Sequence, residues 1–164
     1  MREISFSEQA GKALAALPQG AFLTAGDAAK CNVMTIGWGN IGFIWGKPTF
    51  TVLVRPSRYT HGFMNGGEFT VSVPLGDMKQ ALAVCGSKSG RDIDKVQAAG
   101  LKLRAGQKVA TPVVDGCGLY YECRVVYRYD MAPGQLAAEL ERGCYKDGDH
   151  HTVYVGEIVA AYMD

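Results

Sequence analysis

The sequence predicts a mainly β fold: an antiparallel barrel with short helices at its periphery. Six or more segments have the apolar, β-branched and aromatic composition of strands, and hairpin-scale turns separate most of them. The segments are not joined by regular crossover helices, so the pattern favours an antiparallel barrel over a doubly wound parallel sheet. Glycine supplies 21 of the 164 residues, which is typical of a chain with many tight turns.

The expected strands and helices alternate along the chain. Strands are predicted over residues 21–25, 33–37, 41–45, 49–55, 68–73, 119–129 and 151–162, with further short strands after Pro112. Helices are predicted over residues 8–17, 57–65, 77–85, 92–99 and 135–142. Ser7 is a favourable N-cap for the first helix, which Pro18 and Gly20 end, and Ser57 is a favourable N-cap for the second.

Size and charge set limits on the partners. A chain of 164 residues can bury about 70% of its unfolded surface, so we expect a single domain over residues 1–164. Seventeen basic and 16 acidic residues give a net charge of +1, which argues against a broad nucleic-acid or anionic-membrane surface but allows a local basic pocket. The longest uncharged stretch, residues 31–46, is rich in Gly and Asn and unlike a membrane span, and no N-terminal signal is recognisable.

The cysteines and histidines do not form a recognisable metal or nucleophile motif. Five cysteines, an odd number without a CxxC pair, predict free thiols in a reducing cytoplasm. His150 and His151 are adjacent, so on a strand they would point to opposite faces and would not chelate one ion. A nucleophile pair of Cys144 and His151 lacks any local signature. We therefore expect no metal site and no covalent intermediate.

Gly37, Gly39 and Gly42 match the dinucleotide fingerprint GxGxxG, but their context does not. That motif must open a helix, whereas here a strand and a turn follow, and no acidic residue lies about twenty residues further on. The glycines are better explained as turn or bulge positions, or as places where a ligand lies close to the backbone.

Two basic, hydroxyl-rich turns are candidates for binding an anion. Residues 55–60, RPSRYT, place guanidinium groups and hydroxyls at a strand-to-helix turn. Residues 87–95, SKSGRDIDK, add three more cations and a variant capping box of Ser89 with Asp92. Each turn could instead be solvated and carry an ordinary helix cap. Two such turns in a chain of net charge +1 favour convergence on one anionic ligand.

The aromatic residues around the glycines have two interpretations. Trp38, Phe43, Trp45 and Phe50 are each expected to be core or interface residues. Aromatic side chains beside a glycine-rich strand can also stack on a flat ring.

Several segments, taken in order, resemble the flavin reductase-like family, which includes the flavoredoxins. They are NVMTIGWGNIG at 32–42, WGKP at 45–48, VRPSRYT at 54–60, FTVSVP at 69–74, CGSKSGRDIDK at 85–95, YEC at 121–123 and HTVYVGEI at 151–158. The resemblance implies an FMN-binding split β-barrel with Greek-key topology, FMN as cofactor, and a homodimer with flavin sites near its interface. The aromatic segment 43–50 is the expected contact between copies.

The resemblance also implies roles for individual residues. Those expected to line the isoalloxazine ring are Met34, Thr35, Ile36, Gly37 and Trp38. Those expected at the phosphate and ribityl chain are Arg55, Ser57, Arg58, Tyr59 and Thr60, with Ser89, Gly90 and Lys95 on a second phosphate-side turn. His151 corresponds to a histidine near the ring and is the one candidate catalytic residue.

The expected activity is hydride transfer from NADH or NADPH to FMN, followed by electron transfer to an acceptor. Longer members of the family carry a C-terminal extension that shapes the site, and this chain ends soon after Gly156 and Glu157. We therefore expect reduction by NADH and NADPH with little selectivity. The alternatives are a flavoredoxin-like FMN electron carrier that works with a redox partner protein and has no NAD(P)H activity of its own, and a binding module without turnover.

Overall fold

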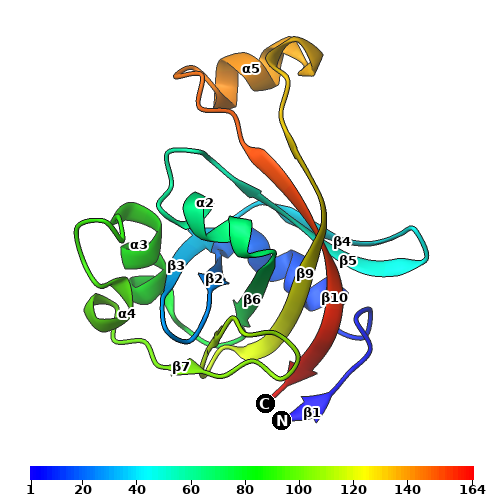
Figure 1. Cartoon of the computed structure of the whole chain (residues 1–164), viewed down its shortest axis with the longest axis vertical. Helices are drawn as coiled ribbons and strands as arrows, with labels where there is room; N and C mark the ends of the chain where they lie inside the picture. The colour runs from blue at the N-terminus through cyan, green and yellow to red at the C-terminus, as the bar shows by residue number, and fades with distance from the viewer.

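A computed structural model describes residues 1–164 as one curled antiparallel sheet with helices around it (Figure 1). The strand order is β3-β2-β6-β9-β10-β5-β4, with β1 paired to β10. These strands are β1 Arg2–Glu3, β2 Ala21–Gly26, β3 Cys31–Ile36, β4 Gly39–Ile44, β5 Lys47–Val54, β6 Glu68–Pro74, β9 Gly118–Asp130 and β10 Thr152–Met163. A separate two-stranded ribbon consists of β7 Leu103–Arg104 and β8 Val113–Val114. The mainly β, antiparallel prediction is confirmed.

The barrel is open between β3 and β4. These strands stand at opposite ends of the hydrogen-bonded order, yet only Gly37 and Trp38 connect them. A link of two residues spans about 10 Å at most, so the two edges of the sheet must approach each other at this turn. No ladder joins them, and the last residues of β3 therefore form an edge. The connection from β5 to β6 passes over the positions of β10 and β9, as in a Greek key.

Alternation along the strands gives the sheet two buried faces. In β2, Phe22 and Leu23 are both fully buried but belong to different clusters of core residues. Leu23 packs inside the barrel, and Phe22 packs in the cluster that includes Leu82 of the helix α3 (Lys79–Ser87). Successive side chains on a strand point to opposite faces, so β2 is apolar throughout because a helix covers its outer face.

All five helices begin two or three residues later than predicted, and all but α3 are shorter. The others are α1 Ala10–Ala16, α2 Thr60–Phe63, α4 Lys95–Ala98 and α5 Ala138–Cys144, with 3-10 turns η1 Leu17–Gln19, η2 Met64–Gly66 and η3 Pro133–Gln135. The caps predicted at Ser7 and Ser57 are wrong, because α1 begins after Gln9 and α2 begins after Tyr59. Asp94 caps α4 by accepting a hydrogen bond from the Gln97 amide, so the predicted box of Ser89 and Asp92 does not form.

Two regions extend away from the barrel. Strands β9 and β10 continue past the other strands and carry α5 at their far end (Figure 1). The hairpin of β4 and β5 ends in a two-residue turn, Trp45–Gly46, with positive φ at both residues, +55° and +72°. Phe50 is fully buried in the core, whereas Trp45 is 62% exposed.

All five cysteines are free thiols. No group of three or more His, Cys, Asp or Glu side chains lies close enough together to hold a metal ion. None of the helices has both the length and the apolar character that crossing a bilayer requires.

Candidate functional site

Two neighbouring cavities collect most of the residues singled out in the sequence. The first, which we call the strand cavity, has a volume of about 200 Å³ and is lined by Met34, Thr35, Ile36, Gly37, Trp38, Leu53, Arg55, Arg58 and His151. The second, the basic cavity, has about 140 Å³ and is lined by Ser57, Arg58, Tyr59, Ser87, Lys88, Ser89, Arg91 and Lys95. Arg58 lines both, so the two cavities are adjacent parts of one site.

The strand cavity lies where the barrel is open. Its floor is the exposed edge of β3 and the turn that follows, where backbone groups have no partner strand on one side. Thr35 donates a hydrogen bond of 2.6 Å to the carbonyl of Leu82, which ties this edge to α3. Trp38, half exposed, lies 5.5 Å from the His151 ring at an interplanar angle of 56°. The cavity therefore combines free backbone groups with aromatic walls.

Two cations of the basic cavity are held by the C-terminal end of α3. Arg58 donates to the carbonyls of Gly86 at 2.9 Å and Cys85 at 3.3 Å, and Lys95 donates to the carbonyl of Cys85 at 3.2 Å. The last carbonyls of a helix lack partners within it and carry partial negative charge, so they attract cations. The fold thus brings together two positive charges from segments 37 residues apart in the sequence.

No carboxylate balances these two charges. Lys95 is only 4% exposed, and neither it nor Arg58 forms an ion pair with an acidic residue. Burial, together with the charge of Arg58, lowers the pKa of Lys95 to about 8. Burial also lowers the pKa of Arg58. Buried like charges without a counter-ion are costly, and an anion between them removes that cost.

The rest of the basic cavity has the same chemistry. Arg91 donates to the carbonyl of Ser57 at 3.0 Å and lies over the Tyr59 ring at 5.2 Å. Lys88 and three serine hydroxyls complete the lining, which includes no acidic residue. Hydroxyl and cationic donors around a small cavity fit a phosphate group.

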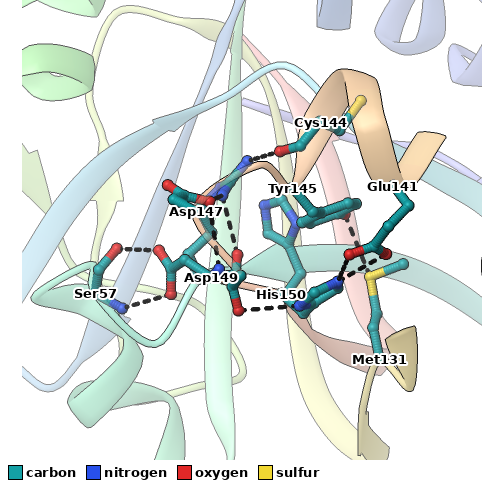
Figure 2. A network of polar contacts seen from close by, with 11 residues as sticks. Ser57, Met131, Glu141, Cys144, Tyr145, Asp147, Asp149 and His150 are labelled. Carbon is teal, nitrogen blue, oxygen red and sulfur yellow. Dashed lines mark hydrogen bonds and ion pairs between the residues drawn. The ribbon is translucent and has the colours of Figure 1, made fainter. Parts of the chain in front are cut away.

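Arg55 lines the strand cavity together with Arg58 but does not line the basic cavity. Its guanidinium donates to the carbonyls of Cys144 at 2.7 Å and Asp149 at 2.9 Å, and it lies 5.1 Å from the centre of the Tyr145 ring (Figure 2). Asp147 adds an ion pair of 3.4 Å. These contacts attach segment 144–149, which leads into His151 of the strand cavity, to the end of β5.

Asp149, from the same segment, contacts the turn after β5. The Ser57 hydroxyl donates to its carboxylate, and the Ser57 amide lies 3.4 Å from the same group (Figure 2). Ser57 lines the basic cavity as expected, but its hydroxyl binds an acidic residue instead of capping a helix.

The two adjacent histidines precede β10, which begins at Thr152, so neither lies on a strand, and they have different hydrogen-bond partners. Nε2 of His150 lies 2.9 Å from both carboxylate oxygens of Glu141 on α5, and this bond raises the pKa of His150. His151 lines the strand cavity, and its Nδ1 lies 2.8 Å from the hydroxyl of Tyr145. Burial, and next the charge of Arg55, lower the pKa of His151 to about 4, so the ring is neutral at pH 7. The partner of His151 is thus Tyr145 and not Cys144.

Two predicted site residues line neither cavity. Thr60 is fully buried and accepts a hydrogen bond of 2.7 Å from the Asn32 amide. Gly90 packs against Asn32 and Tyr59 so closely that a Cβ there would lie 2.7 Å from a ring carbon of Tyr59. Both support the turns behind the site. The structure also places at the site five residues that the sequence did not identify as ligands. Four of them line the cavities and one contacts His151: Leu53, Ser87, Lys88 and Arg91, and Tyr145.

Comparisons with known proteins identify the family of this chain. The model of the family described as "Flavin reductase like domain" matches residues 15–164. The chain belongs to the flavin reductase-like family. A curated member from Archaeoglobus fulgidus, described as uncharacterized, is 31% identical over 143 residues, which are 87% of this chain and 71% of that protein.

Solved structures of family members share the fold. The flavoredoxin from Methanosarcina acetivorans is 27% identical, with a TM-score of 0.70 over 88% of this chain and 68% of that one. An FMN-binding protein from Thermus thermophilus, solved with 1-cyclohex-2-enone, is 25% identical, with a TM-score of 0.67 over 88% and 69% of the two chains.

Proposed function

We propose that this member of the flavin reductase-like family is an FMN-binding oxidoreductase. The observation that carries the proposal is the pair Arg58 and Lys95, two neighbouring cations without a carboxylate partner, beside a cavity with an aromatic wall and a free strand edge. Phosphate and flat ring are the two recognisable parts of FMN. The similarity to a flavoredoxin and to an FMN-binding protein supports the same ligand.

Different residues are proposed to contact the phosphate and the ring of FMN. Arg58 and Lys95 bind the phosphate, with Ser57, Tyr59 and Ser89 completing that cavity. The backbone of residues 34–38 would hydrogen-bond the ring, which would lie beside Trp38 and His151. Thr60 and Gly90 support the turns behind the site, and Arg55 fixes the position of segment 144–149.

When bound, FMN supplies the redox chemistry, accepting a hydride from NADH or NADPH and passing electrons to an acceptor. The protein binds and orients both reactants. A neutral His151 at the cavity can donate or accept a hydrogen bond but does not act as a cation at pH 7. Hydride transfer itself needs no general base, so we propose that His151 orients a reactant and contributes modestly to the rate.

The alternative is an FMN electron carrier without NAD(P)H activity of its own, which the similarity to the Methanosarcina flavoredoxin favours. The absorption spectrum of the purified protein, recorded anaerobically before and after NADH or NADPH, decides between the two. Bleaching by either nucleotide supports the oxidoreductase. Bleaching by dithionite alone supports the carrier, and failure to bind FMN rejects both.

We further propose that the protein is a cytoplasmic homodimer of one-domain subunits. The exposed apolar side chains Phe43, Ile44 and Trp45 cluster at the tip of the β4–β5 hairpin and offer a surface for a second copy. Five free thiols suit a reducing compartment.

A further inference from the structure

The hydroxyl of Tyr145 lies between two acceptors in a nearly dry environment. It is 2.8 Å from Nδ1 of His151 and 3.3 Å from the sulfur of Met131, and Tyr145 is only 5% exposed (Figure 2). A phenol has one proton to donate. The choice between the two acceptors determines which nitrogen of His151 carries its own proton.

The imidazole nitrogen is the stronger acceptor. A thioether sulfur accepts hydrogen bonds weakly, whereas the unprotonated nitrogen of a neutral imidazole is a full acceptor at the shorter of the two distances. Tyr145 therefore donates to Nδ1. Because a neutral imidazole has a single N–H, the proton of His151 must then be on Nε2.

The Tyr145 ring is itself held on both sides. Arg55 lies 5.1 Å from its centre, and the His150 ring stacks on it at 4.7 Å with an interplanar angle of 10°. Arg55 is in turn bonded to the backbone of segment 144–149, and His150 is bonded to Glu141. The hydroxyl thus approaches His151 from a fixed direction.

The opposite edge of the His151 ring has no hydrogen-bond partner within the protein. His151 lines the strand cavity, its Nδ1 edge is occupied by Tyr145, and Nε2 has no hydrogen-bond partner within the protein. We propose that Tyr145 is a positioning residue: it fixes the tautomer and orientation of His151 so that Nε2–H donates into the strand cavity. The ligand atom it meets is a hydrogen-bond acceptor, a carbonyl oxygen or an unprotonated ring nitrogen.

A donor of this kind suits a redox site. It polarises an acceptor atom without adding a formal charge, and it keeps its form as long as the ring stays neutral. The charged groups nearest to His151 are Arg55, Asp149 and His150, and none of them hydrogen-bonds the ring. The identity of the acceptor as part of FMN or its reaction partner rests on the function proposed above, but the tautomer is a property of the ligand-free protein.

The test is the tautomer of His151 in the ligand-free protein, measured by NMR after labelling histidine with nitrogen-15. In the wild type we expect a single tautomer, with a pyridine-like Nδ1 and a pyrrole-like Nε2 at neutral pH. Tyr145→Phe keeps the aromatic ring between Arg55 and His150. In this variant we expect the nitrogen-15 chemical shifts of Nδ1 and Nε2 of His151 to move toward each other as the two tautomers exchange. Tyr129→Phe, the same change at an exposed tyrosine, is the matched control and should leave both shifts unchanged.

A pyrrole-like Nδ1 in the wild type, or unchanged His151 shifts in Tyr145→Phe, overturns the proposal. If Tyr145→Phe does not fold, the wild-type shifts still decide the tautomer. FMN titration of the wild type is read separately: absence of FMN binding rejects the proposed function and leaves the tautomer result standing. If FMN binds, Tyr145→Phe should weaken it about two- to tenfold, the range of one neutral hydrogen bond.

Discussion

At the scale of single residues, Lys95 shows how a site for an anion differs from a stable core. Its ammonium is buried beside Arg58, with one backbone carbonyl as partner and no ion pair with an acidic residue. The low pKa of Lys95 means that the folded protein disfavours its charge. Such an arrangement destabilises the protein without ligand and strengthens the binding of an anion.

Lys95→Met should therefore weaken the binding of FMN and stabilise the ligand-free protein. Loss of a charge-assisted hydrogen bond of about 1.5–3 kcal/mol raises the Kd for FMN roughly 10- to 100-fold. Riboflavin, which has no phosphate, should change by less than about twofold in Kd. The free energy of unfolding without ligand should rise on the order of 1 kcal/mol, because an unpaired buried charge is removed.

Fluorescence titration and urea unfolding measure these effects, and Lys12→Met, at an exposed lysine of α1 that lines neither cavity, is the control. Equal losses for the two flavins would show that Lys95 does not bind the phosphate.

Affinity for FMN should depend on pH on the alkaline side. Lys95 is charged below its pKa of about 8 and loses its proton above it, so FMN should bind progressively more weakly as the pH rises through 8, by at most about tenfold per unit. The phosphate is already a dianion there, since its second pKa is about 6. Titrations from pH 6.5 to 9.5 should show this decline for FMN but not for riboflavin. Lys95→Arg, which stays charged, should remove it, and a decline that persists in this variant would assign the titration to another group.

At the scale of elements, Arg55 attaches segment 144–149 to the end of β5. This segment connects α5 to β10, and its contacts with the end of β5 are the bonds from Arg55 and Ser57. Its position determines where Tyr145 and His151 lie, so a change in this segment should affect the whole strand cavity.

Arg55→Ala should weaken the binding of FMN and of riboflavin by similar factors. The substitution releases segment 144–149 from the end of β5 and removes no phosphate ligand. Two hydrogen bonds to carbonyls from a charged donor are lost, and the free energy of unfolding should fall on the order of 1–3 kcal/mol. Limited proteolysis should cut residues 131–150 faster than in the wild type. Arg142→Ala, at an exposed arginine on α5, is the control. If the variant binds FMN more weakly but riboflavin as well as the wild type does, Arg55 contacts the phosphate.

At the scale of the whole molecule, the β4–β5 hairpin is the feature that a monomer does not explain. Phe43 is 64% exposed and Trp45 62% exposed, and Trp45 occupies a left-handed backbone conformation that is unusual for a large side chain. Apolar groups gathered at a hairpin tip destabilise a soluble monomer unless another surface covers them.

We expect the wild type to be a dimer at low micromolar concentration, and Phe43→Asp with Trp45→Asp to convert it to a monomer. Light scattering measures the mass of both. Leu140→Asp, a matched change at an exposed leucine of α5, should leave the dimer intact. A wild type that is monomeric and still binds FMN would remove this hairpin from the proposed assembly.

The sequence by itself was sufficient for the class of fold and for the segments that meet at the site. Apolar, β-branched segments and turn residues are local signals, and they located the seven longest strands to within about two residues but missed the two-residue strands β1 and β7. The basic turns at 55–60 and 87–95 and the family resemblance likewise identified most of the residues that line the two cavities. Helix starts were less predictable. The Ser57 hydroxyl, for example, hydrogen-bonds the carboxylate of Asp149, which is distant in sequence, and does not cap the helix that follows it.

The tertiary structure alone decided what each of these residues does. Arg55 and Arg58 are three positions apart and chemically identical, yet one holds carbonyls of segment 144–149 and the other holds the end of α3. Lys95 became a buried, unbalanced charge only because α3 and α4 meet, and Tyr145 reached His151 only through the turn between them. The strength and role of a charge depend on burial and on partners distant in sequence, and neither is encoded in a local pattern.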